Sequence, residues 1–133
     1  MISKLPNITT SIFTVMSEMA SDYNALNLSQ GFPNFKSDSY LIELVNKAMA
    51  EGYNQYAPMS GYLELRETIC DKTKLLHSKK YNSDTEITIT AGATQAIFTA
   101  IATVINKDDE AIIFTPAYDC YGPAIELFGG ITI

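Results

Sequence analysis

Apolar positions recur at helical spacing in three stretches of the chain, over residues 12–20, 41–49 and 62–76. A Thr-Thr-Ser run precedes the first stretch and an Asp-Ser pair precedes the second, so both have residues that can cap a helix. Gly52 follows the second stretch, where a glycine commonly ends a helix. The pattern predicts three amphipathic helices, each with one apolar stripe turned toward a core.

The stretch around which the chain is organised, residues 86–105, changes its pattern twice. Residues 86–90 alternate polar side chains with β-branched apolar ones, which is typical of a strand. Residues 95–105 are apolar on nearly every side, which predicts a buried helix. The small residues 91–94 between them predict a tight turn from strand to helix.

Further strands and a helix complete the predicted architecture. Residues 27–35 predict a short strand that ends in a Gly-Phe-Pro turn. Residues 110–115 form an apolar run typical of a buried parallel strand, 122–128 predict a helix, and 131–133 begin another strand. This alternation predicts an α/β fold with a doubly wound, mainly parallel sheet and ligands at the carboxyl ends of its strands. Because the sequence stops inside a strand, we expect it to be the opening portion of a larger protein.

The turn at residues 91–94 has the composition of an anion site. A helix that begins directly after a strand presents unpaired backbone N–H groups and the positive end of its dipole. Gly92 and Ala93 leave room for close approach, and Thr94 adds a hydroxyl donor. A tight structural turn without a ligand is the alternative. The chain has neither a P-loop nor a Gly-x-Gly-x-x-Gly motif, so a nucleotide is not the favoured ligand.

Two tyrosines stand out because of their positions. Tyr118 follows the predicted strand 110–115, so it is expected at the same edge of the sheet as the small-residue turn. Tyr56 lies in an irregular loop with Pro58 and Gly61, where a tyrosine satisfied locally on the surface is the alternative to a functional role. A phosphate-binding turn beside an aromatic ring suits a ligand with a phosphate at one end and a flat ring at the other.

Composition and charge narrow the class of partner. The 133 residues carry a net charge of −6 and no extended basic cluster, which argues against nucleic acid and anionic membranes as partners. The two cysteines, Cys70 and Cys120, are too few for a disulfide framework and lack metal-site spacing. No segment has the pattern of a signal peptide or a membrane helix. We therefore expect a cytoplasmic protein that binds a small molecule or another protein.

Four motifs, in order along the chain, resemble one enzyme family. They are Asn-Leu-Ser-Gln-Gly-Phe-Pro-Asn-Phe, Asn-Gln-Tyr-Ala-Pro-Met-Ser-Gly, Thr-Ala-Gly-Ala-Thr-Gln-Ala and Thr-Pro-Ala-Tyr-Asp-Cys-Tyr. Together they resemble the class I/II aminotransferases, which are fold-type I enzymes dependent on pyridoxal phosphate (PLP), and most closely the methionine, kynurenine and glutamine-type branch. The resemblance implies an N-terminal arm and small-domain segment over residues 1–37. Residues 38–133 would begin the PLP-binding large domain, which is incomplete at Ile133.

The resemblance assigns roles in cofactor binding to five residues. It makes Gly92, Ala93 and Thr94 the cradle of the PLP phosphate, through backbone N–H groups and the threonine hydroxyl. It makes Tyr118 the aromatic that stacks on the pyridine ring. It also makes Tyr56 the residue that reaches the phosphate of a neighbouring subunit, which implies a homodimer in the full-length form.

Two residues correspond to substrate positions of the family. Gly31 matches the glycine whose backbone meets the substrate carboxylate. Phe13 matches a position lining the pocket for the substrate side chain, with core packing as the alternative. The implied reaction moves an amino group between an amino acid, methionine or an aromatic one, and a 2-oxo acid.

The family's Schiff-base lysine is the main departure from the pattern. None of the chain's lysines lies in the family's lysine motif, so no catalytic residue is assigned and the isolated chain is expected to be inactive. Two alternatives remain. One is a PLP-dependent carbon–sulfur lyase, which shares the cofactor cradle. The other is a non-catalytic, truncated binding module.

Overall fold

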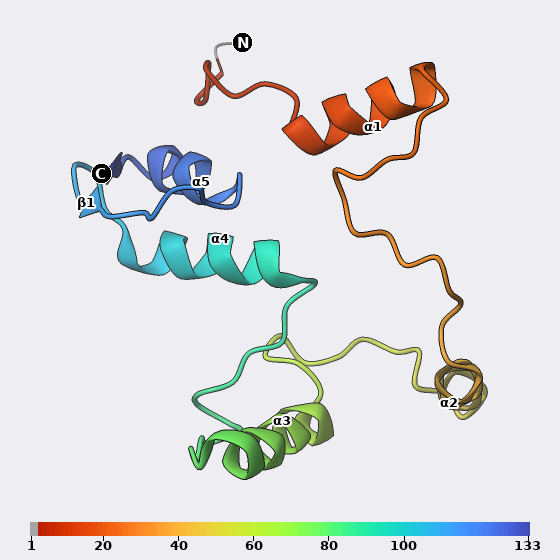
Figure 1. Ribbon diagram of the computed structural model, residues 1–133. Helices are drawn as coiled ribbons and strands as arrows, with labels where there is room; N and C mark the ends of the chain where they lie inside the picture. The colour runs from red at the N-terminus through yellow and green to blue at the C-terminus, as the bar shows by residue number, and fades with distance from the viewer. Residues whose placement is uncertain (1–2) are drawn as a thin grey trace. The chain divides into compact units, whose positions relative to one another are not determined.

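The fold consists of five helices and two short strands in the part of the chain that the structure describes. The computed structural model describes residues 3–133, and its elements run in the order α1, α2, α3, α4, β1, α5, β2 (Figure 1). The chain divides into two compact units. The first comprises the N-terminal residues up to Ile42 together with Ile101–Ile133, and the second comprises Glu43–Ala100.

Local capping explains where α1 begins. Helix α1 spans Ile12–Asp22, and its N-cap Ser11 has an extended backbone with φ −63° and ψ 149°. The Ser11 hydroxyl oxygen accepts a hydrogen bond from the Thr14 N–H at 3.3 Å, which satisfies one of the unpaired donors of the first turn. The helix predicted over residues 12–20 is confirmed and runs two residues further.

Helices α2 and α3 also follow the predicted boundaries closely. Helix α2 spans Ser39–Ala50, and the Asp38 carboxylate accepts a hydrogen bond from the Tyr40 N–H at 2.8 Å. Gly52 follows with φ +94°, a conformation that favours glycine at a helix end. Helix α3 spans Leu63–His77. The helix ends at His77, one residue beyond the predicted stretch 62–76.

The C-terminal part of the first unit is a strand–helix–strand unit. Strand β1 (Glu110–Ala111) pairs in parallel with β2 (Ile131–Thr132), in the register Glu110 to Ile131 and Ala111 to Thr132. Helix α5 (Tyr121–Leu127) connects the two strands and packs against β2. The parallel pairing and the helix between the strands are confirmed. The strand expected over 110–115 is assigned only over Glu110–Ala111, although one further bond, from the Ile113 N–H to the Ile133 carbonyl at 3.0 Å, continues its pairing.

Two predicted strands are absent. Neither residues 27–35 nor residues 86–90 pair with another strand in the described part of the chain. In the second segment, the Ile89 N–H donates to the carbonyl of Ser60 at 2.9 Å, but no ladder follows. A strand is stabilised by repeated hydrogen bonds to a neighbouring strand. Alternation of polar and apolar side chains was therefore insufficient to form a strand here.

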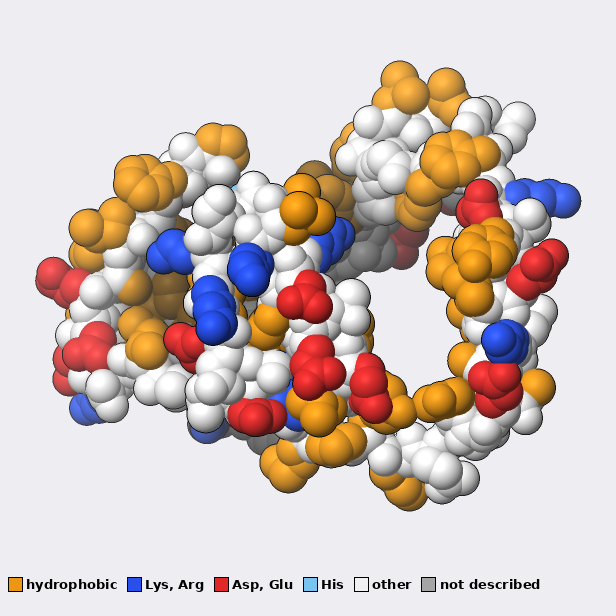
Figure 2. All heavy atoms as spheres, turned by 90° about the horizontal axis from the view of Figure 1, so that it is seen from below, with side chains coloured by type: hydrophobic (Ala, Val, Ile, Leu, Met, Phe, Trp, Pro, Cys, Tyr) orange, Lys and Arg blue, Asp and Glu red, His pale blue; other side chains and the backbone are white. Residues whose placement is uncertain are grey.

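The apolar core is small. The buried hydrophobic side chains of the described residues are Ala124 and Ile125, both in α5. Helix α4 spans Ala93–Val104 and has no buried residue, so the predicted buried helix 95–105 exists as a helix but the expectation that it is buried is wrong. Figure 2 shows apolar side chains exposed on the face that it displays. No helix among the described residues is both long and apolar enough to cross a membrane.

Candidate functional site

The turn that precedes α4 is held in shape by its own side chains. Gly92 has φ +96°, and its Cβ position is surrounded by open space. The Thr90 hydroxyl donates to the carbonyl of Gly92 at 3.0 Å, and the Gly92 N–H donates to the carbonyl of Thr90 at 2.9 Å. The Gln95 amide oxygen accepts from the Ala91 N–H at 2.6 Å. These three bonds fix the turn from both sides.

The same bonds identify the groups that fit a phosphate. The N–H groups of Ala91 and Gly92 are already used within the turn. Those of Ala93 and Thr94 belong to the first turn of α4 and have no acceptor within the helix. The exposed Thr94 hydroxyl lies on the same turn. The N–H groups of Ala93 and Thr94 are therefore the donors that fit a phosphate. Gly92 contributes its positive φ and its lack of a side chain.

The Tyr56 loop forms a separate cavity in the same unit. A cavity of about 400 Å³ is lined by residues of the loop between α2 and α3, including Tyr53, Tyr56 and Tyr62. The rings of Tyr53 and Tyr62 meet edge to face, with centroids 6.0 Å apart. Partial desolvation, and then the carboxylate of Glu64, raises the pKa of Tyr62 above its usual value. Tyr56 is fully exposed, and the α4 turn does not line this cavity.

Three predicted site residues of the first unit line a single cavity. Phe13 comes from α1, Gly31 from the segment after α1, and Tyr118 from the segment after β1. The cavity has a volume of about 440 Å³, and Ser29 and Gln30 complete its lining. The rings of Phe13 and Tyr118 have centroids 6.3 Å apart and are tilted by 34°. The first unit thus gathers residues from three distant parts of the sequence.

The lining of this cavity determines what it can accept. It carries two aromatic rings, two hydroxyls and a carboxamide, and no charged side chain. The Cβ position of Gly31 has no atom within 4 Å, so its backbone is open to close approach. Such a lining suits a small molecule with an apolar or aromatic part and a polar end.

Sequence reasoning missed two residues that shape the second unit. Arg66, the only arginine of the chain, is buried in α3 and donates to the backbone carbonyls of Gly61 and Ser83. Gln95 was not singled out, although a glutamine at the third position of a helix often reaches back to cap it. Both cysteines, Cys70 and Cys120, are free. The described residues contain no cluster of three or more potential metal ligands.

Comparison with known proteins gives consistent matches across the chain. A family model described as "Aminotransferase class I and II" matches residues 23–133. Methionine aminotransferase of Escherichia coli is 50% identical over 97% of this chain, which corresponds to 33% of that protein. Human kynurenine–oxoglutarate transaminase 3 is 29% identical over 98% of this chain, corresponding to 29% of its length.

Solved structures agree with this result. An E. coli protein whose structure and reactivity identified a methionine aminotransferase function has a TM-score of 0.93 at 49% identity, covering 99% of this chain and 35% of its own. N-succinyldiaminopimelate aminotransferase of Mycobacterium tuberculosis has a TM-score of 0.89 at 32% identity, covering 100% and 35%. The chain therefore spans about a third of the length of these relatives. The matches confirm the fold class predicted from the sequence.

Proposed function

Because the chain belongs to the class I and II aminotransferases, we propose that it supplies the phosphate-binding turn and part of the substrate pocket of a PLP-dependent aminotransferase. Members of this family use PLP, so the predicted cofactor and the predicted enzyme class follow from membership. The full protein would exchange an amino group between an amino acid and a 2-oxo acid. The 50% identity to a methionine aminotransferase favours this reaction over the carbon–sulfur lyase alternative.

The observation that carries the proposal is the cavity shared by Phe13, Gly31 and Tyr118. These are the residues that the family pattern assigns to the substrate and to the cofactor ring, and they line one space in the first unit. The aromatic lining supports an amino acid with an apolar or aromatic side chain, methionine among them. Tyr118 would offer its ring face to the pyridine ring, and the Gly31 backbone would meet the substrate carboxylate.

The second unit would hold the cofactor by its phosphate. The first-turn N–H groups of Ala93 and Thr94 and the Thr94 hydroxyl would bind the phosphate oxygens, assisted by the dipole of α4. When bound, PLP supplies the electron sink that lets an amino acid lose its α-proton. Tyr56 is fully exposed, and this exposure supports a homodimer in which Tyr56 would contact the phosphate of the partner subunit.

The 133-residue chain by itself is proposed to lack turnover. Its eight lysines are all exposed, and none occurs in the lysine motif of the family; they are Lys4, Lys36, Lys47, Lys72, Lys74, Lys79, Lys80 and Lys107. A proton-transferring lysine works within a pocket beside its substrate, and an exposed lysine has no such enclosure. Transamination by the purified chain at a rate typical of enzymes would contradict this part of the proposal.

Binding of pyridoxamine phosphate tests the cofactor assignment. This form has no aldehyde, so it cannot react with surface lysines, and its intrinsic fluorescence reports binding. We expect it to bind at least about tenfold more tightly than pyridoxamine, because only the phosphate makes charge-assisted hydrogen bonds with the turn. Thr94→Val removes the hydroxyl donor and should weaken binding by about fivefold to tenfold.

A matched control distinguishes the site from a general effect. Thr88→Val makes the same change outside the turn, and it should leave the affinity for pyridoxamine phosphate unchanged. Equal affinity for the two ligands, or equal effects of the two threonine variants, would contradict phosphate binding at Thr94.

A further inference from the structure

We propose that Arg66 is a positioning residue for the cofactor site. It would hold together the end of the Tyr56 loop and the segment that leads into the phosphate-binding turn, both in the second unit. This inference rests on the proposed function, because it concerns the same turn. Arg66 itself is not proposed to contact substrate or cofactor.

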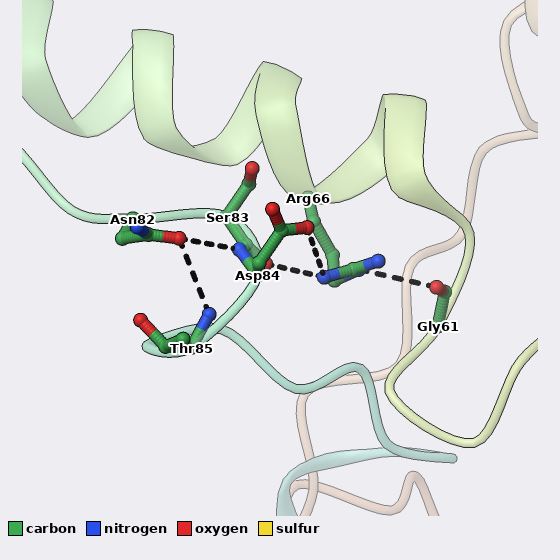
Figure 3. A network of polar contacts seen from close by, with 6 residues as sticks. All are labelled: Gly61, Arg66, Asn82, Ser83, Asp84 and Thr85. Atoms are coloured by element: carbon green, nitrogen blue, oxygen red, sulfur yellow. Dashed lines mark hydrogen bonds and ion pairs between the residues drawn. The ribbon is translucent and has the colours of Figure 1, made fainter.

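The contacts of Arg66 are made to two separate segments (Figure 3). Its side chain is almost fully enclosed, with the residue 7% exposed. Nε donates to the carbonyl of Gly61 at 3.1 Å, and Nη1 donates to the carbonyl of Ser83. One guanidinium group therefore ties α3 to a loop before it and to a loop after it.

The segment that ends at Gly61 also contacts the segment that follows Ser83, at Ile89. Gly61 is buried with φ +97°, and it lies so close to Ile89 that a Cβ added at Gly61 would overlap Cγ1 of Ile89. The Ile89 N–H donates to the carbonyl of Ser60 at 2.9 Å. Ile89 directly precedes Thr90, whose hydroxyl fixes Gly92. A continuous series of contacts therefore leads from Arg66 to the turn.

The segment around Ser83 is itself a rigid support. The Asn82 carboxamide oxygen accepts from the N–H groups of Asp84 and Thr85, at 2.8 and 3.3 Å (Figure 3). The Glu86 carboxylate accepts from the Asn82 N–H at 2.7 Å. The Ser83 carbonyl therefore belongs to a hydrogen-bonded turn. Its bond to Arg66 fixes the position of this turn relative to α3.

The two bonds from Arg66 to the carbonyls of Gly61 and Ser83 form a clamp, to which the ion pair with Asp84 contributes little. The distance from Nη1 of Arg66 to the Asp84 carboxylate is 3.6 Å, and the Asp84 side chain is 74% exposed. Because the Asp84 carboxylate is surrounded by water and the separation is long, its attraction to the guanidinium is largely screened. The two carbonyl contacts, which need the rigid fork of an arginine, are the significant ones, and a lysine ammonium cannot reproduce their geometry.

These contacts also exclude a different role for the residue. Arg66 is the only arginine in the sequence, so it is the obvious candidate for holding a substrate carboxylate. Its guanidinium is instead enclosed, with Nε and Nη1 committed to backbone carbonyls. Releasing it would leave the buried Gly61 carbonyl without this donor, which is costly.

Three variants of the chain test the proposal. Arg66→Met removes the donors, Arg66→Lys keeps the charge without the fork, and Asp84→Asn removes only the ion pair. We expect both Arg66 variants to raise the exchange rate of the Ile89 amide hydrogen by about tenfold or more, measured by NMR. Asp84→Asn should change this rate by less than about twofold.

A second measurement separates positioning from general support of the fold. The ratio of the affinities for pyridoxamine phosphate and pyridoxamine reports the geometry of the turn. In Arg66→Lys we expect this ratio to fall by about fivefold or more, with the helix content by circular dichroism unchanged. A purely structural role would lower helix content and weaken both ligands equally.

Specific results would overturn the proposal. An unchanged Ile89 exchange rate, or an unchanged affinity ratio, in Arg66→Lys would contradict the proposal. If Arg66→Met fails to fold, the Arg66→Lys variant alone tests the proposal. An Asp84→Asn variant that behaves like Arg66→Met would also contradict it, because the ion pair would then carry the effect. If the unmodified chain shows no preference for the phosphate form, the proposed function fails, and the Ile89 exchange rate still determines whether the clamp exists.

Discussion

Two glycines of the second unit share a backbone conformation but differ in their surroundings. Gly61 has φ +97° and Gly92 has φ +96°. A side chain at Gly61 would overlap Ile89, with its Cβ 2.5 Å from the Ile89 Cβ, whereas a side chain at Gly92 would meet open space. The two positions therefore separate the cost of backbone strain from the cost of overlap.

Substituting each glycine with alanine should have unequal effects. Gly92→Ala should lower the free energy of unfolding by about 1–2 kcal/mol, from strain alone. Gly61→Ala should lower it by a further 1–3 kcal/mol or so, because the overlap with Ile89 adds to the strain. Urea denaturation followed by circular dichroism measures both values.

The second substitution Ile89→Ala provides the control. In the Gly61→Ala background it removes Cγ1 of Ile89 but leaves the Ile89 Cβ, so only part of the loss should be recovered. In the Gly92→Ala background it should bring no recovery. Equal costs for the two glycine variants would show that the contact between Gly61 and Ile89 is not significant.

At the scale of single residues, the sequence predicted some site residues and missed others. Phe13, Gly31 and Tyr118 could be named because their motifs resemble a family, and they line one cavity. The roles assigned to them stay predictions. Arg66 could not be found in this way, because its partners are backbone carbonyls, which no side-chain pattern reveals.

At the scale of elements, the N-terminus of α4 depends on Gln95. Gln95→Ala removes the acceptor for the Ala91 N–H, which lies 2.6 Å from the amide oxygen. We expect the Ala91 amide to exchange faster by about fivefold to tenfold and the affinity for pyridoxamine phosphate to fall by about threefold. NMR exchange and fluorescence titration measure the two quantities.

Gln95→Glu separates geometry from charge in the same turn. The carboxylate can still accept from the Ala91 N–H, so protection of that amide should be kept. Its negative charge beside the proposed phosphate should nevertheless weaken binding more than Gln95→Ala does. If Gln95→Ala leaves Ala91 exchange unchanged, the hydrogen bond from Gln95 does not hold the turn.

Helices were predictable from the sequence, whereas strands were not. Helix α1 begins after a visible cap, Ser11, and α2 ends before a visible stop, Gly52, because helix signals are local. The segments 27–35 and 86–90 have strand-like sequences but no partner strand in the described residues. Pairing depends on residues elsewhere in the chain, so local alternation could not predict it.

At the scale of the whole molecule, much apolar surface is exposed. Phe114 is 89% and Ile112 is 75% exposed, and buried apolar side chains are few among the described residues. Burial of apolar area is the main source of folding stability, so we expect the isolated 133-residue chain to unfold in a broad thermal transition. It should also bind the dye anilinonaphthalene sulfonate strongly.

The exposed aromatic ring of Phe114 gives a direct check. Phe114→Ser should reduce the dye fluorescence, whereas Thr115→Ser, next to it, should not. A sharp, cooperative transition without dye binding would contradict the expectation. It would indicate that the apolar surface is covered in solution, for example by a second copy of the chain.

The contact between Phe13 and Tyr118 has a consequence for how the chain tolerates changes in length. The two rings are separated by roughly a hundred positions, against roughly twenty between the paired strands β1 and β2. The entropy of closing a flexible loop grows only with the logarithm of its length, so this fivefold difference adds only about 1.4 kcal/mol. A change in the length of a loop between the rings would therefore cost their contact little, provided that it leaves Gly31 and helices α2 to α4 intact.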